Sequence, residues 1–305
     1  MLKISTITGT AALTGLMLLA GCGNLVASPR ATAYTEIRGS AQSLEITLSP
    51  DRSDIVLSAL SAGDALMTAE LQHLGDLSYG VSGDEQRVIT IDEAPVMNVT
   101  YTGPSMRWLV ALDPSMPLTI TTNVGSGDTT LPLETFIVNG LTANVGSGDV
   151  DISLPSGEAA IPVSINTGSG NVSLDTADGS QLSLETINLG SGNFRLDSGA
   201  SASYTGSIAV ESGDVALNLA NDNSGALRVV IDSGDARISL PDGVALRVEV
   251  TIASGDINAG NRMQRVSGGE TLTGNSGVWE TAGFADAEQQ FTVTLTIDSG
   301  DLTIE

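Results

Sequence analysis

The stretch "ANVGSGDVDISL", residues 143–154, places Gly-Ser-Gly-Asp between two segments in which apolar and polar residues alternate. Before the tetrapeptide the apolar residues are Ala143 and Val145, and after it they are Val150 and Ile152. Such alternation is typical of strands with one buried face, and here it changes parity across the glycines. A chain whose parity changes must turn or bulge, so the stretch predicts a strand, a sharp corner and a second strand.

The tripeptide at the centre of this stretch recurs along the chain. Ser-Gly-Asp or Ser-Gly-Asn ends at positions 128, 149, 171, 193, 214, 235, 256 and 301, and a degenerate Ser-Gly-Val ends at 278. Successive copies lie 21 to 23 residues apart, which makes nine copies of one unit. A unit this short cannot bury an apolar face alone, whereas stacked units can.

Each regular copy is expected to form a structural turn. A glycine kept in every copy suggests a positive φ angle, and the Asp or Asn suits an Asx-type turn in which its side chain bonds nearby backbone. The predicted turn residues are Gly127, Asp128, Gly148, Asp149, Gly170, Asn171, Gly192, Asn193, Gly213, Asp214, Gly234, Asp235, Gly255, Asp256, Gly300 and Asp301.

The repeat predicts an all-β protein. We expect a single-stranded, right-handed parallel β-solenoid of about nine rungs, which would span about 40 Å at ~4.8 Å per strand. An antiparallel β-sandwich or meander with the triplets as hairpin turns is the alternative. Along the chain we expect a signal peptide over 1–21, a tether over 22–33, an irregular β part over 34–117 and the repeats over 118–305, with a surface excursion at 261–290.

The N-terminus has the features of an export signal: one basic residue, Lys3, then an apolar stretch and small residues. It ends in Leu-Ala-Gly-Cys at 19–22, which resembles the bacterial lipobox. That resemblance implies acylation of Cys22, the only cysteine, and attachment to the extracytoplasmic face of a membrane. Gly23, in place of an aspartate retention signal, favours the outer membrane in a cell with two membranes. An ordinary signal peptide with a chance cysteine is the alternative.

Composition limits the partners of this chain. Its 305 residues are 41% apolar, which permits a core, but only 3% aromatic, so that core must consist mainly of aliphatic side chains. The net charge is −24, and Lys3 is the only lysine. Such a surface repels nucleic acids and anionic lipid headgroups, so we expect no nucleic-acid partner.

Two longer stretches resemble a known family. They are "RWLVALDPSMPLTITTNVGSGD" at 107–128 and "SLPDGVALRVEVTIASGDI" at 239–257. Together with the serial triplets they are similar to the bacterial toast-rack and putative-adhesin group over residues 35–305. This resemblance implies a β-solenoid-like protein of the cell envelope, and it supplies no catalytic motif.

No pattern in the sequence favours a cofactor, a metal site or catalysis. A phosphate loop needs a lysine and a following helix, which the Gly-Ser-Gly stretch lacks. One acid per 21 or 22 residues is too sparse for a dedicated calcium site, although weak, diffuse binding of calcium stays open. His73, the only histidine, has no evident catalytic partner. Trp279, beside the degenerate triplet, is the first candidate for a binding patch.

Three functions are therefore compared. The first is a lipid-anchored, non-enzymatic scaffold or adhesin-like surface in the bacterial envelope, with an envelope protein or a glycan as its partner. The second is an accessory component of an envelope stress-sensing system. The third is a solenoid enzyme acting on glycans, which would need a groove with clustered carboxylates.

Overall fold

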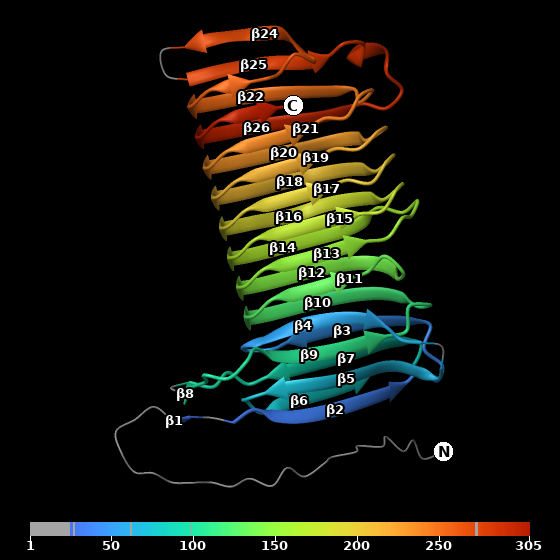
Figure 1. Cartoon of the computed structure of the whole chain (residues 1–305). Coiled ribbons are helices and arrows are strands. Elements are labelled where there is room, and N and C mark those ends of the chain that lie inside the picture. Colours follow the sequence, from blue (N-terminus) through green and yellow to red (C-terminus); the bar gives the residue numbers. More distant parts are fainter. Residues whose placement is uncertain (1–24, 27, 62, 98, 272–273) are drawn as a thin grey trace.

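Two long β-sheets stack their strands along one axis and enclose the core between them (Figure 1). The computed structural model describes residues 25–26, 28–61, 63–97, 99–271 and 274–305. Outside the two sheets it contains a small pair, β1 (Leu25–Val26) and β8 (Val99–Thr100), and the short 3-10 helix η1 (Phe284–Asp286).

The first sheet contains 13 of the described strands. In spatial order these are β24 (Met263–Thr271), β25 (Gly274–Thr281), β22 (Leu246–Ser254), β26 (Phe291–Ser299), β20 (Ser224–Ser233), β18 (Ser203–Ser212), β16 (Gln181–Ser191), β14 (Ile161–Ser169), β12 (Ile137–Ser147), β10 (Pro117–Ser126), β3 (Ser43–Ser49), β7 (Gln86–Glu93) and β6 (Leu77–Ser82).

The second sheet contains 12 of the described strands, and most of them are shorter. In spatial order these are β2 (Arg30–Ile37), β5 (Ala65–His73), β9 (Met106–Leu112), β4 (Ser53–Ala59), β11 (Thr129–Pro132), β13 (Val150–Leu154), β15 (Val172–Thr176), β17 (Phe194–Asp197), β19 (Val215–Asn218), β21 (Ala236–Ser239), β27 (Leu302–Ile304) and β23 (Ile257–Asn258).

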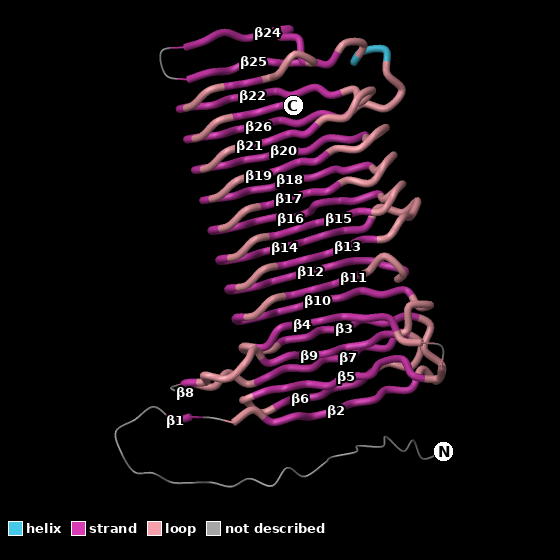
Figure 2. The backbone as a smooth tube through the Cα atoms, in the orientation of Figure 1, coloured by secondary structure: helices cyan, strands magenta, loops and turns pink. Residues whose placement is uncertain are grey.

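One rung is a strand of the first sheet, a tight corner at the repeated triplet, a strand of the second sheet and a return loop (Figure 2). Neighbouring rungs pair in parallel and in register, with Ser147 opposite Ser169 and Val150 opposite Val172. The parallel β-solenoid is therefore confirmed, and the antiparallel sandwich is wrong for the repeat region.

The alternating pattern places one set of side chains between the sheets. In β13, for example, Val150, Ile152 and Leu154 are buried, whereas the intervening residues are not. Aliphatic side chains from both sheets form one continuous hydrophobic cluster, which also contains the few aromatic residues that are fully buried, including Phe194 and Tyr204. The ring of Tyr204 meets that of Phe291 edge to face, with 6.1 Å between their centroids.

The corners have a backbone geometry that only glycine adopts easily. The central glycines of the eight regular triplets have φ between 128° and 147°. A Cβ atom at Gly148 would lie 2.0 Å from the carbonyl oxygen of Gly127 in the preceding rung. The corner glycine is therefore required both by its own φ angle and by the close approach of the next rung.

The C-terminal end departs from the order of the sequence. β26 lies between β20 and β22 and pairs in parallel with both, so the last triplet stacks between two earlier ones. The degenerate copy among the nine predicted ones, Ser276-Gly277-Val278, is not a corner. It lies in β25, which pairs antiparallel with β22 and with β24, and it forms part of a hairpin at the end of the first sheet. The predicted excursion at 261–290 contains this hairpin and η1.

The irregular N-terminal part continues both sheets and closes the other end of the stack. Here β2 and β5 pair antiparallel, as do β6 and β7. Tyr34 of β2 and Tyr79 of β6 stack with 4.2 Å between ring centroids, and Arg87 and Glu36 form an ion pair of 2.7 Å beside them. The expected tether over 22–33 is too long. The chain is already a β-strand from Arg30 onward, because β2 pairs antiparallel with β5.

Candidate functional site

The acidic column at the corners is a hydrogen-bonded ladder. The Oδ1 atom of Asp128 accepts a hydrogen bond of 2.9 Å from the backbone N–H of Asp149, whose own Oδ1 accepts one of 2.7 Å from the N–H of Asn171. The same bond recurs at every later step of the stack. Because β26 lies between β20 and β22, the last two steps run from Asp235 to Asp301 and from Asp301 to Asp256. The side chain thus bonds the next rung and not its own turn, which corrects the Asx-turn interpretation.

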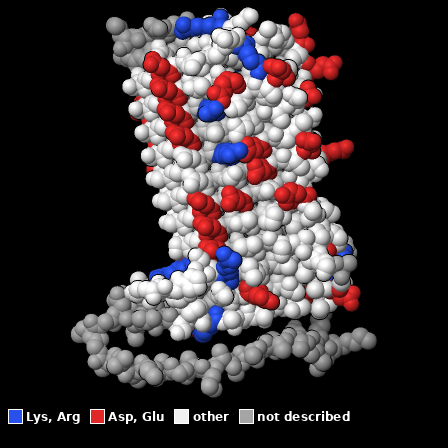
Figure 3. All heavy atoms as spheres, viewed as in Figure 1, with Lys and Arg blue, Asp and Glu red and all other residues white. Residues whose placement is uncertain are grey.

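This ladder explains why an acid or an amide is repeated at the third triplet position. Both side chains offer the oxygen that the next backbone N–H requires, whereas valine at position 278 does not. Wherever another rung follows, one carboxylate oxygen of the aspartate accepts such a bond, which gives the column a structural role. Figure 3 shows acidic side chains lined up in rows along the stack.

A second ladder lies on the outer face of the first sheet. Four asparagines, Asn123, Asn144, Asn166 and Asn188, occupy the same position in four consecutive rungs. The Nδ2 group of each later residue donates to the Oδ1 atom of the one before it, over 2.9, 3.0 and 3.2 Å. Our sequence analysis missed these residues. Their signal was present, because each asparagine stands three residues before the serine of its triplet.

Beside this ladder a shallow trough runs along the solenoid. Its floor is a column of glycines, Gly125, Gly146, Gly168 and Gly190, which leave a gap between the asparagine ladder and the exposed corner serines. The trough has a volume of about 940 Å³. It ends at Ala209 and Glu211, which occupy the asparagine and glycine positions of the next rung.

The trough is nearly free of charge. Glu211 at its end is the only ionisable residue among those that line it. In the two rungs beyond Glu211, the same column holds the exposed acids Asp232 and Asp298. A neutral, hydrogen-bonding surface four rungs long is therefore set within a chain whose net charge is −24.

Two carboxylates meet on the opposite sheet. Asp175 of β15 and Asp197 of β17 stand in register on its outer face. Burial, and then the hydrogen bond and negative charge of Asp197, raise the pKa of Asp175. Burial acts against ionisation of Asp197 too, but hydrogen bonds from Arg195 and Asn218 lower its pKa overall. These carboxylates lie on the sheet that does not form the trough, so the pair and the trough do not make the catalytic groove that a glycan-active enzyme would need.

The raised pKa of Asp175 gives a prediction about pH. Protonated Asp175 stabilises the folded protein. This contribution is fully present at a pH below the pKa that Asp175 has in the unfolded chain, and it is lost as the pH rises through the higher pKa of the folded state. We therefore expect Asp175→Asn to stabilise the protein at pH 7, by about 0.5 kcal/mol at most because the side chain is exposed and solvent screens it. Thermal unfolding at pH 7 and pH 3 checks this, with Glu158→Gln in an exposed loop as the control. If Asp175→Asn raises the stability at pH 3 as much as at pH 7, the raised pKa of Asp175 is contradicted.

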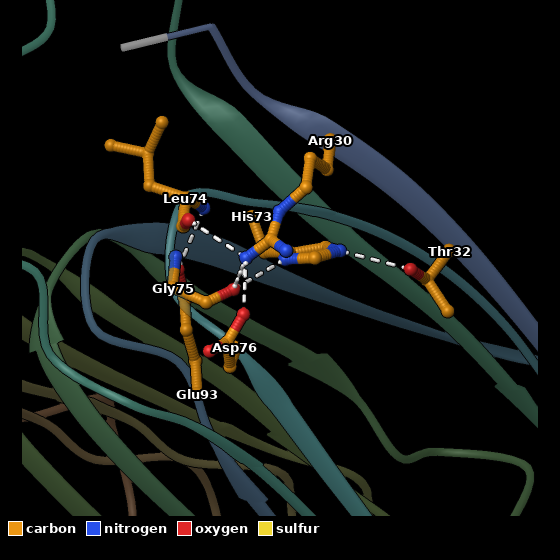
Figure 4. A network of polar contacts seen from close by, with 7 residues as sticks. All are labelled: Arg30, Thr32, His73, Leu74, Gly75, Asp76 and Glu93. Atoms are coloured by element: carbon orange, nitrogen blue, oxygen red, sulfur yellow. Dashed lines mark hydrogen bonds and ion pairs between the residues drawn. The ribbon is translucent and has the colours of Figure 1, made fainter. Parts of the chain in front are cut away.

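His73 is packed into a polar network that fastens the loop after β5 (Figure 4). Its Nδ1 atom lies 2.8 Å from the carbonyl oxygen of Gly75 and must donate to it, so in the neutral ring Nε2 accepts from the hydroxyl of Thr32 at 2.9 Å. Glu93 accepts from the backbone N–H groups of residues 74 and 75, and Arg30 donates to Asp76. The ring is 3% exposed, which favours a structural role over general-base catalysis.

Trp279, the first candidate for a binding patch, packs into the core. Its side chain is only 8% exposed and belongs to the hydrophobic cluster. The guanidinium carbon of Arg265 lies 5.2 Å from the ring centroid, in a cation–π contact. A Cβ atom at Gly277 would come within 2.8 Å of this ring, so the glycine of the degenerate triplet makes room for the tryptophan and does not turn the chain.

The predicted signal peptide, residues 1–21, and the predicted lipidation site, Cys22, lie outside the described residues. Within the part of the chain that the structure describes, we find no helix with the length and apolar character needed to span a membrane.

Parallel rungs, each turned at a Ser-Gly-Asp or Ser-Gly-Asn corner, with ladders on the outer surface, define this molecule as a two-sheet β-solenoid. The family comparison agrees with the resemblance seen in the sequence. The model described as "Toastrack DUF4097" matches residues 119–305, and the "N-terminal domain of toast_rack, DUF2154" matches residues 29–175. The chain belongs to the toastrack family.

Solved structures similar to this chain come from bacteria. A "putative cell adhesion protein" from Clostridium sporogenes ATCC 15579 is 14% identical, with a TM-score of 0.37, covering 91% of this chain and 99% of that one. A "putative adhesin" from Bacteroides fragilis NCTC 9343 is 10% identical, with a TM-score of 0.28 and coverages of 91% and 97%. No curated protein gives a significant match.

Proposed function

We propose that this protein is a rigid, non-enzymatic scaffold or adhesin-like binding surface of the bacterial cell envelope, held outside the cytoplasm by a lipid on Cys22. The observation that supports this most directly is the neutral trough over four locked rungs, which gives a preformed surface for a long partner. The corner ladder fixes each rung to the next, so binding there requires little ordering of the protein.

The position of β2, the first long strand, suits this function. β2 begins at Arg30 and is the edge strand at one end of the second sheet, while the β24–β25 hairpin closes the far end of the first sheet (Figure 1). A lipid on Cys22 would therefore attach the stack by its N-terminal end. The trough would then extend away from the membrane, where a partner in the envelope can reach it.

The lipid anchor has a direct test. Cys22→Ala is expected to move the protein from the membrane fraction to the soluble fraction, because diacylation gives stable membrane attachment and the variant has no acceptor for it. Fractionation of cells followed by an alkaline wash measures the distribution. Gly23→Ala, which keeps the cysteine, is the control. If Cys22→Ala remains in the washed membranes, a different element anchors the chain.

The binding function is tested by photo-crosslinking in the native cells. Photoreactive residues are placed at exposed Ser147 beside the trough and at Val266 in β24, which is 53% exposed. We expect glycan or several surface proteins among the products from Ser147. A single membrane sensor or transporter would support the accessory role in stress sensing instead. Reproducible absence of products at both positions would contradict a binding function.

A further inference from the structure

We propose that the trough binds an uncharged, β-linked polysaccharide chain that lies along the solenoid axis. This inference rests on the proposed function, because it names the chemical class of the partner for the same surface. It is carried by three features of the trough: its charge, its hydrogen-bonding groups and its repeat.

Charge excludes the polyanionic glycans of the envelope. The trough contains no basic residue, and Glu211, Asp232 and Asp298 form an acidic row directly beyond it. The whole chain is also strongly negative. A polyanion would meet repulsion without any compensating cation, whereas a neutral chain meets none. The acidic row also marks where such a chain has to leave the surface.

The asparagine ladder leaves regularly spaced hydrogen-bonding groups free for a ligand. Each amide has two N–H donors and two acceptor sites, and the ladder between Asn144 and Asn166 uses one donor of the later residue and one acceptor of the earlier one. The remaining groups on this outer face point to a partner rich in hydroxyl or acetamido groups. Threonine or serine hydroxyls at Thr121, Thr142 and Ser164 form a second polar column two residues earlier on the same face.

The repeat of the surface suits a sugar chain. Rungs succeed one another at ~4.8 Å, whereas an extended peptide advances about 3.3 Å per residue and cannot repeat one contact at each rung. One hexose of a β-1,4-linked chain advances by nearly one rung, and because successive sugars are turned over, alternate sugars can make equivalent contacts on every second rung. The glycine floor lets the sugar rings lie close to the backbone, and the volume of about 940 Å³ is within the range of ligand pockets, about 300–1,000 Å³.

The column itself provides a variant that should fold. Val230 occupies the asparagine position two rungs beyond Asn188, so the sheet already contains valine at this position. The double substitution Asn144→Val, Asn166→Val removes the central amides without changing charge. Thr296→Val, in the same column but outside the trough, is the matched control. Thermal unfolding of each variant checks the fold, and Asn166→Val alone replaces the double variant if that one unfolds.

The experiment measures binding of cellohexaose and of N-acetylated chitohexaose to the full-length lipidated protein in detergent, by calorimetry. Polygalacturonate serves as the anionic comparison. We expect at least one neutral hexasaccharide to bind, a roughly ten- to thirtyfold weaker affinity for the double variant, no change for Thr296→Val and no binding of polygalacturonate.

The inference is overturned if neither neutral hexasaccharide binds, or if the double variant binds as tightly as the wild type. Preference for polygalacturonate would overturn it as well. Protein crosslinks from Ser147 in cells, together with absent hexasaccharide binding, would reject the glycan while leaving the binding function itself in place.

Discussion

Gly148→Val is expected to lower the free energy of unfolding by about 3 kcal/mol or more. Two effects add at this position. The φ of 139° is one that a β-branched residue resists. In addition, any Cβ atom would lie 2.0 Å from the carbonyl oxygen of Gly127, so the two rungs would have to separate. Separation would also lengthen the hydrogen bond between Asp149 and Asp128. Thermal and denaturant unfolding followed by circular dichroism measure the loss.

A glycine outside the corners provides the matched control. Gly157 lies exposed in a return loop, has no positive φ, and a Cβ atom there would meet nothing within 4 Å. Gly157→Val should therefore change stability little. Equal stability of the two valine variants would show that the corner does not depend on glycine.

Removal of residues 291–305 is expected to unfold the C-terminal end of the stack and leave the rest intact. β22 has β26 as its parallel neighbour, so the truncated chain leaves β22 and the β24–β25 hairpin without their connection to β20. In hydrogen exchange, residues 246–281 should lose protection, whereas the rungs from β10 to β18 should retain it, because solenoid rungs are stabilised by their nearest neighbours.

A synthetic peptide covering residues 291–305 gives the complementary measurement. Added to the truncated protein, it should restore protection over 246–281 by taking the place of β26 and β27. A peptide with Leu295→Asp is the control, because this side chain is 2% exposed in the core. Full protection of 246–281 in the truncated protein before any addition would show that β22 pairs directly with β20.

The repetitive part of the fold could be predicted because its physics is local. The parity change around Gly148 predicts the corner, and the constant spacing of the triplets favours parallel rungs over an antiparallel sandwich, as found with Ser147 opposite Ser169. The exchange of order at the C-terminus could not be predicted, since β26 and β22 carry the same alternating pattern and either could pair with β20. In the structure the second neighbour of β22 is β25, and Trp279 of that strand joins the hydrophobic cluster.

The candidate site was the less predictable part. Trp279 was the first candidate for a binding patch because it lies beside a degenerate triplet, but its ring packs in the core, close to Gly277 and under Arg265. The trough was missed because glycine and asparagine in a turn-rich sequence are readily explained as turn residues. The role of these residues is recognisable only when Asn144 and Asn166 are aligned across rungs. The trough is formed by equivalent residues of several rungs and not by any one segment.

The position of β26 between β20 and β22 also affects the order in which the protein can assemble. A chain is synthesised from its N-terminus, and rungs up to β21 can add to the stack one after another as they emerge. Residues 246–258 emerge next, but β22 and β23 pair with β26 and β27, which have not yet been synthesised. If they stack on β20 in the meantime, they must be released again before β26 can enter. The fold can therefore be completed only after residues 291–305 have been made, and a chain that lacks them cannot finish it.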